Sequence, residues 1–164
     1  MYRENTVTNL SRLIHQRPQA MAILHGGRDY PHIRGNVRFY GTRYGVLVVA
    51  EVTGLPVADD PCENSIFGFH IHTGGGCGGT FDDEFADTLG HYDPYGCPHP
   101  YHAGDLPPLF GNNSGRAFSA FLTDRFTVEE ILGRTVVIHS DPDDFVAQPS
   151  GNSGVKIACG VISK

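Results

Sequence analysis

Histidine side chains are concentrated in the middle and C-terminal parts of this 164-residue chain. Six of its nine His residues lie in, or at the ends of, two long stretches rich in Gly, Pro and Asp. The neutral imidazole ring is the commonest metal ligand among protein side chains. We therefore take these six as candidates for a metal site: His70, His72, His91, His99, His102 and His139.

The first element is the triplet His70-Ile71-His72, at the end of an apolar segment. In a strand, residues two apart point to the same face, so both rings could bind one ion. The alternative is a pair of His residues on a solvated strand face. The apolar segment and the Gly-rich stretch after it favour the metal site.

The second element falls within fifteen residues of one predicted loop. Three His residues and one Asp offer three nitrogens and one oxygen, a set that suits tetrahedral zinc. Loop His residues are commonly just exposed to solvent, which is the alternative. Only Pro100-Tyr101 separates His99 from His102, so the chain must turn tightly there. The four residues are His91, His99, His102 and Asp105.

The third element is His139, which ends an apolar segment and is followed closely by Asp143 and Asp144. A carboxylate that hydrogen-bonds a metal-binding His fixes the orientation of the ring. This spacing predicts that one of the two carboxylates supports a metal ligand.

The segments that must position these residues have the pattern of short strands. Apolar and polar side chains alternate over residues 33–40, and there is no alternation of strands with helices. Long loops over 73–109 and 140–154 are of a kind that is usually functional. The sequence predicts an all-β antiparallel sandwich or barrel, with strands over 20–25, 33–40, 46–52, 66–72, 117–122, 135–139 and 156–162.

The length and composition fit one domain with a proper core. We expect residues 1–17 to form an appendage, with a turn or two of helix over 8–14, and residues 18–164 to form the domain. The net charge of −6 makes a nucleic-acid partner unexpected. Because no segment resembles a signal peptide or a membrane span, we expect a soluble cytoplasmic protein with no membrane partner.

Five motifs, in this order, resemble the copper–zinc superoxide dismutase family, and the resemblance runs from about residue 20 to the C-terminus. The loop lengths look more like those of the bacterial branch. The motifs are Gly68-Phe69-His70-Ile71-His72, His91-Tyr92-Asp93-Pro94, His102-Ala103-Gly104-Asp105-Leu106, residues 133–139 and residues 151–162.

This resemblance implies an eight-stranded Greek-key β-barrel, related to the immunoglobulin-like sandwich, that converts superoxide to O2 and H2O2. It implies that His91 bridges the two ions and takes and returns a proton, and that Asp143 links His70 to His99. The family's interfaces vary, so a homodimer is one possible assembly. The implied ligands are His70, His72, His91 and His139 for copper, and His91, His99, His102 and Asp105 for zinc.

The sequence departs from the family at Lys156, where the family has an Arg that guides the anion to the metal. Lysine keeps the positive charge but lacks the planar fork of a guanidinium group. We therefore expect reduced but measurable activity. The alternative is that Lys156 is a solvated surface residue.

Four Cys residues are present, and none lies in a C-x-x-C pair. In the cytoplasm the default would be free thiols, but the resemblance implies a disulfide between Cys77 and Cys159. For Cys62 and Cys97, a second disulfide and two thiols both remain open.

Two other classes of function compete with the enzyme. A non-catalytic protein that binds zinc or copper for storage, transfer or structure would be compatible with Lys156 and the negative net charge. A β-sandwich interaction module without metal fits poorly with six placed His residues and Asp105.

Overall fold

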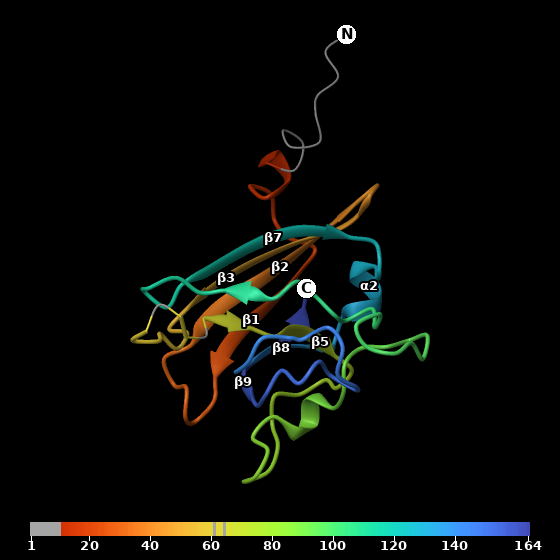
Figure 1. The fold of residues 1–164 in the computed structure, drawn as a ribbon. Helices are drawn as coiled ribbons and strands as arrows, with labels where there is room; N and C mark the ends of the chain where they lie inside the picture. Colours follow the sequence, from red (N-terminus) through yellow and green to blue (C-terminus); the bar gives the residue numbers. More distant parts are fainter. Residues whose placement is uncertain (1–10, 61, 64) are drawn as a thin grey trace.

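A computed structural model describes residues 11–60, 62–63 and 65–164, and most of its regular elements are antiparallel strands (Figure 1). The predicted all-β class is confirmed. Seven strands form one sheet in the order β5-β8-β9-β1-β2-β3-β7. They are β1 (Ala20–Gly26), β2 (Arg34–Thr42), β3 (Gly45–Thr53), β5 (Phe69–His72), β7 (Ala117–Thr123), β8 (Thr135–His139) and β9 (Lys156–Ser163).

Two short strands, β4 (Ile66–Phe67) and β6 (Leu109–Phe110), form a separate antiparallel pair. β4 runs into β5 and β6 leads to β7, which are the two edge strands of the large sheet. The small pair therefore connects the two edges, and the large sheet curls around a single main core (Figure 1).

The core follows from the apolar pattern of the strands. All five residues of β8 are buried, and so are the four residues of β5. Phe39, Phe67, Phe69 and Ile138 are among the largest fully buried side chains. Burial of each such side chain contributes about 1.5–3 kcal/mol, so the core holds rigidly the strands that carry the candidate site.

The structure differs from the expected strand pattern at Gly68, which divides the strand predicted over 66–72. Its N–H donates to Asp141 O at 2.8 Å, and its carbonyl accepts from His139 N at 2.8 Å. A side chain at this position would press on Ser153, where the Cβ contact would be 2.8 Å. The chain therefore bends here so that the loop after β8 can lie close.

Three short elements were not predicted from the sequence. One is β6, and another is the 3-10 turn η1 (Ala86–Thr88) inside the first long loop. The third is the one-turn helix α2 (Val128–Ile131), which begins with a capping box between Thr127 and Glu130. All three are too short to leave a periodic pattern in the sequence.

The predicted N-terminal appendage is described only in part, because residues 1–10 lie outside the described ranges. Residues 11–13 are helical. Leu13 and Ile14 pack against Tyr40, Leu47 and Val49, a cluster separate from the main core. The domain boundary after residue 17 stays a prediction. Within the described ranges, no helix is both long and apolar enough to cross a bilayer.

Candidate metal centre

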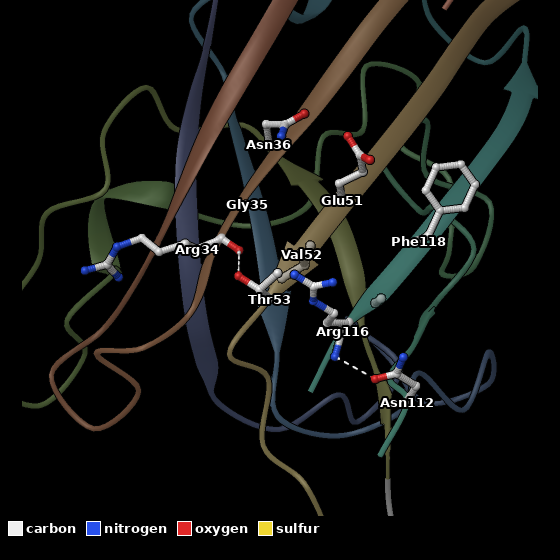
Figure 2. A pocket seen from close by; sticks show the side chains of 10 residues that line it. Arg34, Gly35, Asn36, Glu51, Val52, Thr53, Asn112, Arg116 and Phe118 are labelled. Atoms are coloured by element: carbon white, nitrogen blue, oxygen red, sulfur yellow. Dashed lines mark hydrogen bonds between the residues drawn. The ribbon is translucent and has the colours of Figure 1, made fainter. Parts of the chain in front are cut away.

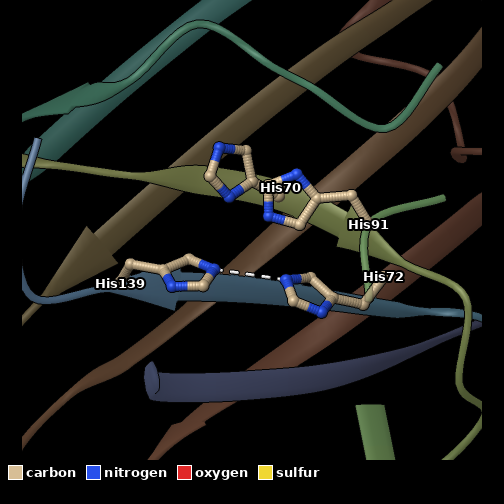
Figure 3. A group of neighbouring side chains, drawn as sticks. All are labelled: His70, His72, His91 and His139. Carbon is tan, nitrogen blue, oxygen red and sulfur yellow. Dashed lines mark hydrogen bonds between the residues drawn. The ribbon is translucent and has the colours of Figure 1, made fainter. Parts of the chain in front are cut away.

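The edge of the large sheet brings three His residues together. His70 and His72 lie two apart on β5, and β5 pairs with β8, which ends at His139. All three side chains are buried. The Nε2 atoms of His72 and His139 lie 3.2 Å apart (Figure 3). This placement follows from the strand geometry, because alternate residues of β5 point to one face.

The first long loop folds back along β5 and adds a fourth ring. Isolated β-bridges pair His72 with His91 and His70 with Asp105. Between them, Ile71 N donates to Gly104 O at 2.9 Å, and Tyr92 N donates to Ile71 O at 2.8 Å. Backbone hydrogen bonds to the rigid strand therefore set the positions of the loop ligands.

Four imidazole rings meet at this point (Figure 3). Each offers one nitrogen, and these four nitrogens all lie within 4.8 Å of one another. His70 Nδ1 and His91 Nε2 are buried without a hydrogen-bond partner, a costly state unless an ion takes their lone pairs. A set of four nitrogens suits Cu(II). The group consists of His70, His72, His91 and His139.

A second group of donors gathers around the carboxylate of Asp105. The Nδ1 atoms of His91, His99 and His102 lie 2.7, 3.1 and 3.2 Å from its oxygens. In a tetrahedral zinc site with bonds of about 2.0 Å, ligand atoms lie about 3.3 Å apart. The three nitrogens and one oxygen therefore fit zinc, and the short Pro100-Tyr101 spacer lets both flanking rings reach Asp105.

His91 belongs to both groups. Its Nδ1 faces Asp105, whereas its Nε2 is a buried nitrogen without a hydrogen-bond partner on the side of the four-ring group. Its ring lies 4.0 Å from the ring of His70, measured between centroids. One ring thus presents a different nitrogen to each group.

Asp143 lies between the two groups and contacts a ring from each. Its two oxygens accept hydrogen bonds from Nε2 of His70 and Nε2 of His99, both at 2.8 Å. Burial alone would raise the pKa of Asp143, but the bonds from His70, Phe145 N and His99 outweigh it and lower the pKa to about 2. Asp143 is therefore ionised at neutral pH and fixes the orientation of both rings.

Burial favours the neutral form of three rings of the first group. It lowers the pKa of His70, lowers that of His72 to about 3, and lowers that of His139 well below its ordinary value. His72 Nδ1 lies 2.8 Å from Leu89 O, so that nitrogen carries the proton and Nε2 keeps a free lone pair. His70, His72 and His139 can therefore offer lone pairs to a metal ion at neutral pH.

Two residues that support the loop were missed by sequence reasoning. Arg125 donates through Nη1 to Pro100 O at 3.2 Å and to His102 O at 3.3 Å. Gln148 makes two bonds to the backbone of His99, accepting from N at 2.9 Å and donating to O at 2.7 Å. Neither lies in a motif, so their role becomes visible only once the loops are folded.

The four-ring group opens to solvent through a hollow of about 720 Å³, which is lined by His72, His91, His139 and Lys156 among others. The ammonium group of Lys156 donates to Asp83 Oδ2 at 2.9 Å and to Phe85 O at 3.1 Å.

A disulfide between Cys77 and Cys159 joins the first loop to β9, as expected. Of the two alternatives left open for Cys62 and Cys97, the structure shows two free thiols.

A separate hollow of about 590 Å³ lies where β2 begins, β3 ends and β7 begins (Figure 2). Arg34, Glu51 and Arg116 contribute to its lining. Arg34 donates to the carbonyls of Pro31 and Ile33. None of the residues predicted to bind metal lines this hollow.

Comparison with known proteins agrees with these two groups. Residues 33–162 match the family model described as copper/zinc superoxide dismutase. The chain belongs to the copper/zinc superoxide dismutase family. The copper–zinc superoxide dismutase 2 of Aquifex aeolicus is 34% identical over 142 residues, covering 78% of each chain. The enzyme of Legionella pneumophila is 35% identical over 135 residues, covering 78% of this chain and 76% of its own.

The fold of this superoxide dismutase family member is also that of solved relatives. The copper/zinc superoxide dismutase from Brucella abortus superposes with a TM-score of 0.74 at 25% identity, covering 88% of this chain and all of that one. The expected Greek-key barrel is thereby confirmed. Family membership implies copper and zinc as the metals, and the two donor groups are of the kinds that those ions prefer.

Proposed function

We propose that this protein converts superoxide to O2 and H2O2, and that its two donor groups hold one copper and one zinc ion. The observation that carries the proposal is the position of His91, whose two ring nitrogens face different groups. The proposed ligands are His70, His72, His91 and His139 for copper, and His91, His99, His102 and Asp105 for zinc.

When bound, copper supplies one-electron chemistry, which oxidises one superoxide and reduces the next. The protein supplies the geometry and one of the two protons that H2O2 formation requires, and solvent supplies the other. His91 Nε2 is buried in the first group, and the His91 residue lines the same hollow as Lys156. We propose that this nitrogen takes up a proton during the first half of the cycle and gives it to the product in the second.

Lys156 is the proposed source of positive charge for the incoming anion. It lines the hollow above the copper ligands, and the side chain of this residue is 18% exposed. A Lys156→Arg variant is expected to raise kcat/KM, because a guanidinium fork orients an anion better than a point charge. An unchanged kcat/KM would remove Lys156 from the machinery.

The test of function is the rate of superoxide loss, which is monitored by stopped-flow spectroscopy with protein loaded with both metals. We expect the rate of superoxide loss with the loaded protein to exceed the rate with the zinc-only protein by about 100-fold or more. His139→Asn, which changes a proposed copper ligand outside the zinc group, is the matched control and should lose this gain. Full occupancy by both metals without activity would support the non-catalytic metal protein instead.

Three finer predictions concern assembly, location and partners. We propose a homodimer as one assembly of this barrel, and light scattering of the metal-loaded protein tests it. The cytoplasmic location stays a prediction, which fractionation of the source cells tests. The absence of a nucleic-acid partner also stays a prediction, consistent with the net charge of −6.

A further inference from the structure

The cation beside the proposed copper ligands is already paired. Lys156 is the first residue of β9 and lies opposite His139 in the sheet. Its ammonium group reaches across the hollow to Asp83 Oδ2, 2.9 Å away, and to Phe85 O. An ammonium group with a counter-ion at this distance presents a dipole to an approaching anion, and a dipole's field falls off faster than that of a free charge.

The carboxylate of Asp83 is held in place by its own segment. Its Oδ1 accepts from Phe85 N at 3.1 Å, while its backbone N donates to Thr80 Oγ1 at 3.1 Å. The Cys77–Cys159 disulfide ties the start of this segment to β9, three residues beyond Lys156. The pair is therefore set by the fold and does not result from a chance meeting of two mobile side chains.

The rest of the rim does not supply a replacement cation. The two long loops, residues 73–109 and 140–154, contain no Lys or Arg. Among the described residues that line the hollow, the other cation is Arg28, and its Nε lies 3.7 Å from Glu84 Oε2. Three further carboxylates line the same hollow: Asp29, Asp82 and Asp93.

When bound, the metal ions would add positive charge beside the His residues that line the hollow, and their attraction would act most strongly at short range. Acidic side chains outnumber Lys and Arg at the mouth of the hollow. With Lys156 paired to Asp83, little positive charge is left there to attract superoxide from solvent. We propose that Asp83 is a positioning residue that restrains Lys156 and thereby sets how fast the site captures an anion. This inference rests on the proposed function.

The decisive comparison is between Asp83→Asn and Asp82→Asn. Both remove one negative charge from the same rim, but Asp83 is the residue that contacts Lys156. We expect Asp83→Asn to raise kcat/KM for superoxide by about 3–10-fold at low ionic strength, and Asp82→Asn to raise it by less than about 2-fold. In the Asp83→Asn background, Lys156→Met should abolish the gain.

A second readout does not depend on turnover. Azide is a small anion whose binding to the Cu(II) protein can be titrated by visible absorption. We expect Asp83→Asn to tighten azide binding by about 3–10-fold and Asp82→Asn to have little effect. If the protein proved inactive, azide would still test the role of Asp83, so failure of this inference and failure of the proposed function are distinguishable.

Equal effects of the two variants, or no gain in azide affinity with Asp83→Asn, would overturn the proposal. Asp83→Ser guards against a local folding defect, because a hydroxyl can still accept from Phe85 N. It must shift kcat/KM and azide affinity in the same direction as Asp83→Asn. A decrease in both quantities with properly folded, fully loaded Asp83→Ser would also contradict the proposal.

Discussion

Asp143 hydrogen-bonds one ring of each donor group, His70 and His99, and its removal should therefore weaken both. In Asp143→Asn an amide NH2 would face a ring N–H, so His70 and His99 could not both keep their present bonds. We expect zinc and copper affinities to fall by about 10–100-fold, measured by competition with a chelator. Asp144→Asn is the control, since an amide there can still accept from Val146 N and Ala147 N.

The buried rings make the metal-free protein sensitive to acid. Burial lowers the pKa of His72 to about 3 in the folded state, whereas the ordinary pKa of 6.5 applies in the unfolded chain. Below pH 6.5 the unfolded chain therefore binds this proton more readily than the folded protein does. Stability is therefore lost as the pH falls from about 6.5 towards 3, by about 1.4 kcal/mol per pH unit for each proton taken up. Denaturant titrations of chelator-treated protein check this, and a flat profile between pH 6.5 and 5 would contradict it.

At the residue scale, the sequence predicts what carries its own chemical signature. His70 and His72 stand out because a strand period places them on one face, and Asp105 stands out because it follows His102 by three residues. Arg125 and Gln148 could not be predicted, because their partners are backbone carbonyls and amides that come near only in the folded loop. Asp83 lies in an acidic run that looks like an ordinary solvated turn.

At the scale of elements, the second long loop depends on Gly151. Its φ of +68° lies in the left-handed region, and a Cβ there would collide with Asp143 Oδ1 and meet His99 Nε2 at 2.6 Å. We expect Gly151→Ala to lower the free energy of unfolding by about 2–4 kcal/mol and to weaken zinc binding.

Gly133→Ala separates the cost of a left-handed backbone from the cost of the Cβ collision. Gly133 has a similar φ of +77° but open space where its Cβ would lie. It should show only the conformational cost, about 1–2 kcal/mol, with zinc affinity unchanged. Equal losses in both variants by thermal and denaturant unfolding would show that the packing of Asp143 against Gly151 does not matter.

The strands were predictable from the sequence where their apolar pattern is long, as in β2, β3 and β8. The course of the loops was not, because it depends on single backbone contacts such as that between Ile71 N and Gly104 O. β6 has two residues and acquires its role only by pairing with β4. Topology thus followed from periodicity and resemblance, whereas loop geometry followed from tertiary contacts.

At the scale of the whole molecule, charge opposes the capture of superoxide from a distance. The chain's formal charge of −6 exceeds the four positive charges that two divalent ions add. At low salt the Debye length is about 30 Å, so an approaching anion senses the net negative charge. We expect kcat/KM to rise by about 2-fold between 0.01 and 0.15 M ionic strength. A fall over this range would show that local attraction dominates.

The claim on which the account depends is that one ring, His91, serves both metal sites. Replacing zinc by Co(II) in the copper-loaded protein tests it directly, because two paramagnetic ions joined by one imidazolate couple their spins. The account predicts that the Cu(II) EPR signal disappears as cobalt fills the second site, and that it persists in a His91→Gln variant. An unchanged copper signal with both sites filled in the wild-type protein would contradict the shared ring.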